Sequence, residues 1–148
     1  VAMEWHTDLE LGYAPMDDIH EEFVDIVARL QAAPDDRLAE LLAELHLHLA
    51  SHFGQENAWM EETAFPPRDC HIGEHDAVLK SVKDVRLLLA DQGNTRICRE
   101  LVAALADWFP GHAAHLDSAL AHWLCKRRLG GSPVVLRRGQ DRCNRGQA

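Results

Sequence analysis

Histidine is over-represented in this sequence, because ten of the 148 residues are histidine while only 6% are aromatic. Five of these histidines, with one glutamate and one aspartate, stand among apolar residues at spacings typical of helices: His20, His52, Glu56, His71, His75, His112 and Asp117. Imidazole and carboxylate groups without cysteine suit iron, zinc or manganese. The chemistry that these residue types indicate together is metal binding.

Four long helical segments must position these side chains. Apolar residues recur at helical spacing over residues 16–33, 37–63, 69–91 and 95–128, with proline or glycine between the segments. Thr95 is the expected N-cap of the last segment. Long amphipathic helices joined by short loops are typical of helical bundles. The sequence therefore predicts an all-α fold, an up-down-up-down antiparallel four-helix bundle with an extended N-terminal arm.

Helical periodicity directs the seven side chains toward the interior of this bundle. At about 100° per residue, His71 and His75 fall on the apolar stripe of their helix, and His52 and Glu56 fall on that of theirs. The other two helices have histidines on their apolar faces as well. Every helix is therefore expected to direct at least one histidine into the core.

So many buried polar groups need a common explanation. A single core histidine is most often satisfied by a neighbouring hydrogen-bonding group, whereas an unpartnered polar group costs about 1–3 kcal/mol. Five histidines and two carboxylates in one small core cannot all be satisfied in that way, but a metal is a partner for all of them. Seven ligands are too many for one ion and sufficient for two ions bridged by the two carboxylates.

The spacing of two candidate ligands on the fourth helix does not fit a regular α-helix. His112 and Asp117 are five residues apart, which places them about 140° apart on a regular α-helix. A local i→i+5 turn would bring them nearly into line, and such π-type turns are frequent at functional sites. Pro110 favours one here because it has no N–H to donate to the regular ladder. We predict a bend or π-type turn between about Ala106 and Asp117.

The parts of the chain outside the bundle differ from it in composition. Residues 1–15 are expected to form the arm, with Trp5 and Leu11 as anchors, and residues 16–129 the bundle. Residues 130–148 are expected to form a basic, flexible tail, because they contain few core-forming residues.

The distribution of charge, the apolar runs and the cysteine spacing argue against several kinds of partner and location. Residues 126–148 contain seven Lys and Arg and one Asp, net +6, which leaves −15 on residues 1–125 of a chain whose total is −9. An acidic body argues against nucleic-acid binding. No apolar run approaches the ~20 residues of a membrane span, and the start of the chain has no signal-peptide pattern. The four cysteines show no CxxC spacing. We therefore expect a cytoplasmic monomer without membrane insertion.

The order of the motifs is similar to that of the hemerythrin family, specifically the bacterial hemerythrins. The resemblance extends from residue 5 to about residue 125 and lies in these residues: Trp5, Leu11-Gly12, Met16-Asp17-Asp18-Ile19-His20, His52-Phe53-x-x-Glu56-x-x-x-Met60, His71-x-x-x-His75 and Trp108-Phe109-x-x-His112-x-x-x-x-Asp117.

This resemblance implies a pair of iron ions with an oxo or hydroxo bridge. It assigns His71, His75 and His112 to one iron, His20 and His52 to the other, and Glu56 and Asp117 to both. The second iron then has an open position, where the family binds O2 reversibly and where small anions such as azide also bind.

The resemblance also implies an apolar ligand pocket at the open position. Trp108 and Phe109 match pocket-lining positions of the family, and we place Phe23 beside them. Ala113 stands where the family usually has a large aliphatic residue, which predicts a roomier pocket.

Other functions are compatible with the same residues. A di-iron enzyme that consumes peroxide or nitric oxide, a sensor of O2, redox state or iron, and a structural zinc bundle are the alternatives. No residue is recognisable as a general acid or nucleophile beside the open iron, which favours binding over turnover. We expect His48 to be a group next to the metal site or pocket. His115 lies about 160° around the helix from Asp117 and is expected to point away from the bridge.

Overall fold

The computed structural model describes residues 2–131, 136–137 and 140–141. Its elements in chain order are the 3-10 turn η1 (Thr7–Leu9), α1 (Ala14–Ala32), the 3-10 turn η2 (Asp35–Arg37), α2 (Leu38–Glu62), α3 (Arg68–Gln92), α4 (Thr95–His112), the π-helical segment η3 (Ala113–Asp117), α5 (Ser118–Arg128), β1 (Leu136–Arg137) and β2 (Gln140–Asp141).

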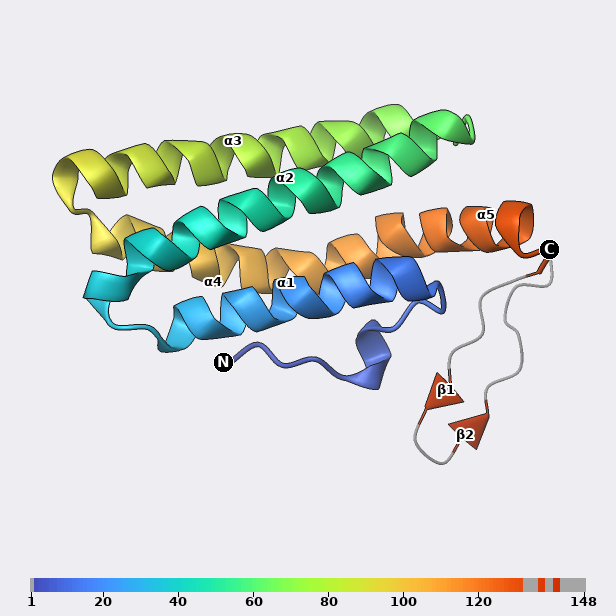
Figure 1. Ribbon diagram of the computed structural model, residues 1–148, viewed down its shortest axis with the longest axis horizontal. Helices are drawn as coiled ribbons and strands as arrows, with labels where there is room; N and C mark the ends of the chain where they lie inside the picture. The colour runs from blue at the N-terminus through green and yellow to red at the C-terminus, as the bar shows by residue number, and fades with distance from the viewer. Residues whose placement is uncertain (1, 132–135, 138–139, 142–148) are drawn as a thin grey trace.

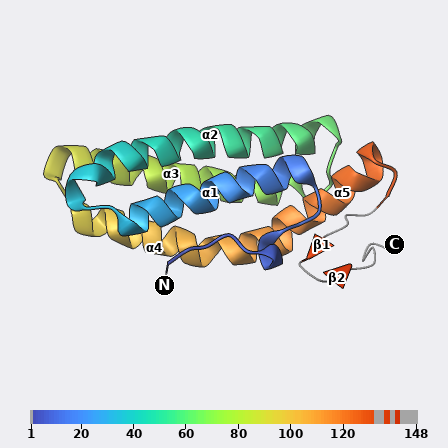
Figure 2. The same ribbon diagram turned by 60° about the horizontal axis from the view of Figure 1, so that its bottom comes forward.

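The helices form one antiparallel bundle. The segments α4, η3 and α5 follow one another without a break and together make the fourth helix (Figure 1). Successive helices run in opposite directions, and α1 and α3 each pack against α2 and α4. Figure 2 shows the same bundle from another side, with the N-terminal arm lying along α4. The predicted all-α, up-down-up-down four-helix bundle is confirmed.

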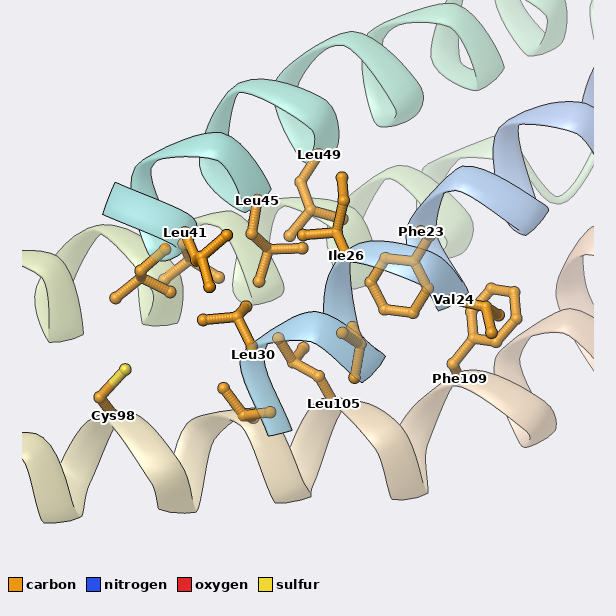
Figure 3. Packing of buried hydrophobic residues seen from close by; sticks show 14 of the residues in the cluster. Phe23, Val24, Ile26, Leu30, Leu41, Leu45, Leu49, Cys98, Leu105 and Phe109 are labelled. Carbon is orange, nitrogen blue, oxygen red and sulfur yellow. The ribbon is translucent and has the colours of Figure 1, made fainter. Parts of the chain in front are cut away.

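Two apolar clusters fill the two ends of the bundle. One lies where the second half of α1 meets the first half of α2 and α4, and it includes Leu30, Leu45 and Leu105, which point toward one another in Figure 3. The other joins the start of α1 to the end of α2 and to α5, and it includes Met16 and Met60. The candidate metal ligands lie between the two clusters, where apolar packing at either end holds the helices around them.

Truncating the core should destabilise the bundle strongly at Leu45. Leu45 is 0% exposed on α2, whereas Leu47 on the same helix is 75% exposed. Leu45→Ala should lower the free energy of unfolding by about 2–5 kcal/mol, because it removes buried methyl groups and leaves a cavity. Leu47→Ala should change it by less than about 0.5 kcal/mol. Urea unfolding measures both, and equal effects would contradict this description of the core.

The start of α1 and the N-cap of α4 differ from the sequence expectation, and α2 and α3 each begin one residue from the expected position. The first helix begins at Ala14 rather than Met16, with Pro15 in its first turn, where a proline removes no helical hydrogen bond. The cap of α4 is Asn94 rather than Thr95, since the Asn94 side chain accepts the N–H of Ile97 at 3.1 Å. These differences are within the one or two residues by which helix ends commonly vary.

The arm joins α1 through a tight turn at Gly12. The Asp17 carboxylate accepts the N–H of Leu11 at 2.8 Å and that of Gly12 at 3.0 Å. Gly12 has a φ of 87°, a conformation that side chains other than glycine rarely adopt. Leu9 is buried, and Trp5 packs against the same apolar cluster. The arm is therefore held to the bundle by both hydrogen bonds and apolar contacts.

The C-terminal tail is described only in part. The two-residue strands β1 and β2 pair antiparallel, with Leu136 opposite Asp141. The rest of the segment for which a flexible tail was predicted, residues 132–135, 138–139 and 142–148, lies outside the described residues. Among the helices that are described, none has the length and apolar character needed to cross a membrane.

Candidate metal centre

The structure brings all seven candidate ligands together in the middle of the bundle. Each of them is 4% exposed or less, although all are polar. Their ligand atoms fall into two overlapping groups that could each hold an ion. One group contains Glu56, His71, His75, His112 and Asp117, and the other contains His20, His52 and Glu56.

The first group places three histidines around one oxygen of each carboxylate. Glu56 Oε1 lies 3.1 Å from His75 Nε2 and 3.9 Å from His71 Nε2. Asp117 Oδ1 lies 2.9 Å from His71 Nε2 and 3.2 Å from His112 Nε2. Three nitrogens and two oxygens therefore converge on one point.

The second group uses the other oxygen of each carboxylate. Glu56 Oε2 lies 3.1 Å from His20 Nε2 and 3.0 Å from His52 Nε2. Asp117 Oδ2 lies 3.1 Å from His20 Nε2. Each carboxylate thus turns one oxygen to each group of histidines, which is the arrangement that two bridging carboxylates require. With Asp117 Oδ2 added to its three donors, the second group has four donor atoms, one fewer than the first group.

These donor atoms fit a metal. Several buried nitrogens and oxygens that face the centre make no hydrogen bond within the described part of the chain, namely Glu56 Oε1, His71 Nε2, His75 Nε2, His112 Nε2 and both oxygens of Asp117. Buried polar atoms without partners are costly, and ligation of a cation would satisfy them. Nitrogen and carboxylate oxygen donors without sulfur are suitable for iron, zinc or manganese.

The charges in the centre also favour a cation. Burial raises the pKa of Glu56 and Asp117, but the neighbouring histidines outweigh burial, and both pKa values lie below their usual range. Burial lowers the pKa of His20, but the adjacent carboxylates of Asp117 and Glu56 outweigh burial and raise it to about 10. A proton on His20 therefore offsets the charge of the carboxylates, and a metal that binds there must displace it.

Helical spacing explains how the chain supplies four of the ligands. His52 and Glu56 are four residues apart on α2, and His71 and His75 are four apart on α3. Residues four apart lie one above the other on the same face of a helix. Each of these two helices therefore delivers a pair of donors to the same depth of the bundle.

The fourth helix supplies its two ligands through the π-helical segment. The N–H of Ser118 bonds to the carbonyl of Ala113, which closes an i→i+5 turn between His112 and Asp117. This wider turn brings residues five apart nearly into line. The predicted π-type turn is confirmed, although α4 itself continues through Pro110 to His112.

Two polar residues next to the ligands were not found by sequence reasoning. Asn57 Oδ1 lies 2.8 Å from His75 Nδ1, and Glu74 Oε1 lies 2.8 Å from His112 Nδ1. Both residues adjoin a ligand in the sequence, at Glu56 and at His75. Adjacency alone does not reveal these contacts, because each one crosses from one helix to another.

The aromatic residues predicted for the pocket lie on two sides of the centre. The rings of Phe23 and Phe109 are 4.7 Å apart, and Phe109 lies 5.1 Å from the ring of His20. Trp108 instead lies against His112, with ring centroids 4.3 Å apart. Phe109 is followed one turn later by Ala113, which is 2% exposed.

The two further histidines considered from the sequence lie outside both groups of donors. The His48 ring lies 5.2 Å from that of His52 and 6.3 Å from that of Phe23, and its Nδ1 is 3.7 Å from Glu22 Oε2. Burial, with His52 and His20 nearby, lowers the pKa of His48 to about 4. His115 is exposed on η3.

The fold and the site together define a four-helix bundle with a buried metal-binding cluster at its middle. Residues 11–124 match the family model described as the hemerythrin HHE cation binding domain. The chain belongs to the hemerythrin family.

Its relatives include several bacteriohemerythrins. One from Ralstonia nicotianae is 36% identical over 125 residues, which cover 84% of this chain and 90% of that protein. One from Stenotrophomonas maltophilia is 28% identical over 121 residues, 79% of this chain and 78% of the relative. One from Aquifex aeolicus is 28% identical over 120 residues, 78% of this chain and 92% of the relative. The resemblance inferred from the motifs is confirmed.

Proposed function

We propose that the chain binds two iron ions, bridged by Glu56, Asp117 and an oxo or hydroxo group, and that it binds O2 reversibly. Three histidines would hold one ion, and His20 and His52 the other. When bound, the iron pair supplies the electrons and the open coordination position that O2 binding requires.

The unequal donor sets of the two groups carry this proposal. Three histidines and two carboxylate oxygens face the first position, whereas two histidines and two carboxylate oxygens face the second. A metal site that lacks one protein ligand keeps a position for an outside molecule. The asymmetry therefore supports a position for O2, or for a small anion such as azide, on the side of His20 and His52.

The residues around this side would exclude water from it. Phe23 and Phe109 are fully buried, and they flank His52 and His20 with their rings. An apolar wall contains no proton donor and no water molecule. Bound O2 would therefore not be released in a reduced form. We therefore assign Phe23, Phe109 and Ala113 to the ligand pocket, with Trp108 acting from the side of His112.

The composition and spectrum of the purified protein test the proposal. We expect iron, at about two per chain, and a near-ultraviolet charge-transfer band from an oxo-bridged diferric pair. The visible spectrum of the reduced protein should change on addition of O2 and return when O2 is removed. One metal per chain, or stoichiometric zinc without such a band after native expression, would contradict it.

An enzyme or a sensor built on the same centre is the second candidate. The small side chain of Ala113 favours it, because a roomier pocket admits water or a small anion and would shorten the life of the oxygenated form. Steady-state turnover of peroxide or nitric oxide with an added reductant distinguishes these functions. Sustained turnover would show that the protein is an enzyme and would contradict reversible O2 binding as its function.

A further inference from the structure

Glu74 joins two side chains of the neighbouring helix at the edge of the centre. Its Oε1 atom accepts the Nδ1–H of His112 at 2.8 Å and the Nε1–H of Trp108 at 2.8 Å. The Trp108 ring lies over His112, with centroids 4.3 Å apart and planes inclined by 33°. His112 is thus held in one orientation by a carboxylate at its outer nitrogen and by an indole on its face.

This partner distinguishes His112 from the other candidate ligands. The outer nitrogens of His20, His52 and His71 make no hydrogen bond among the described residues. That of His75 lies 2.8 Å from the neutral amide of Asn57. Within the described part of the chain, one of the five histidines, His112, therefore has a carboxylate at its outer nitrogen, and His112 belongs to the three-histidine group.

A carboxylate at this position changes the ligand in two ways. By accepting the Nδ1–H, it leaves Nε2 free to bind a metal and fixes the ring, and it makes the imidazole a stronger electron donor. A stronger donor stabilises a ferric ion more than a ferrous one. The Glu74 side chain is 39% exposed, so water partly solvates its negative charge.

We propose that Glu74 is a positioning residue that, through His112, strengthens metal binding in the three-histidine group and lowers the reduction potential of the iron there. This inference rests on the proposed di-iron function. Glu74 also braces α3 against α4, and a purely structural role would depend on the two hydrogen bonds but not on the negative charge.

The variant Glu74→Gln separates charge from structure, because the amide oxygen still accepts both N–H groups. We expect a higher midpoint potential of the iron pair in spectroelectrochemical titration, and a Co2+ affinity of the metal-free protein that is about tenfold lower. Asn57→Asp adds the missing carboxylate at His75, and it should shift both quantities in the opposite direction. Glu100→Gln removes an exposed charge from α4 without touching the centre and should change neither.

The outcomes separate this inference from the proposed function. Unchanged potential and Co2+ affinity in Glu74→Gln would overturn the inference and leave Glu74 a structural brace. A shift of equal size in Glu100→Gln would overturn it as well, because any lost charge would then suffice. If the chain holds no iron pair but Glu74→Gln still lowers Co2+ affinity, the proposed function fails while the role of Glu74 stands.

Discussion

Replacing Glu56 with alanine is expected to abolish binding of both iron ions at once. Glu56 turns Oε1 toward His75, at 3.1 Å, and Oε2 toward His20 and His52, at 3.1 and 3.0 Å. Its removal takes one ligand from each group and leaves buried histidines around an incomplete bridge. Iron content and the charge-transfer band, measured after identical purification, should both fall to near zero.

The control for this variant lies on the same helix. Glu61→Ala removes an exposed carboxylate of α2 and should leave the iron content unchanged. Circular dichroism should show a helical fold in both variants, because the two apolar clusters at the ends of the bundle are untouched. Loss of one iron alone from Glu56→Ala would show that the carboxylate serves only one group.

Replacing Ala113 with leucine is expected to slow autoxidation of the oxygenated form by about tenfold, which corresponds to ~1.4 kcal/mol in the activation barrier. Ala113 is buried one turn after Phe109, and it belongs to the same apolar cluster as Phe109 and Phe23. In the pocket that we propose, a larger side chain would leave less room for water or a small anion to enter. Azide binding should become slower in the same variant, and rapid mixing with azide and the decay of the oxygenated spectrum measure the two rates.

The matched control is a second buried alanine away from the pocket. Ala121 is 0% exposed and belongs to the apolar cluster at the other end of the bundle. Ala121→Leu should destabilise the fold by overpacking, by about 1–3 kcal/mol, without changing either rate.

Unchanged rates in Ala113→Leu would mean that access is controlled elsewhere. A surface cavity of about 520 Å³ lies between the arm and the fourth helix, and Pro110 and Ala114 line it. That cavity would then be the next route to test.

The helices, the seven candidate ligands and the irregular turn could all be predicted from the sequence. Helical periodicity and the proline and glycine breaks act over a few residues, so they can be recognised in one segment at a time. The pairs His52 with Glu56 and His71 with His75 share a face wherever their helices lie. Likewise, His112 and Asp117 are five residues apart, so they can reach the same site only if the helix contains a wider turn.

How the helices and their side chains meet could not be predicted in this way, because it depends on the tertiary structure. The tertiary structure determined which oxygen of Glu56 and of Asp117 faces which histidines, that Trp108 lies against His112, and that Glu74 of α3 reaches His112 of α4. Such contacts depend on how two helices are rotated and shifted relative to each other and on the rotamers of their side chains. Those quantities arise from packing the whole bundle, and no single segment of the sequence contains them.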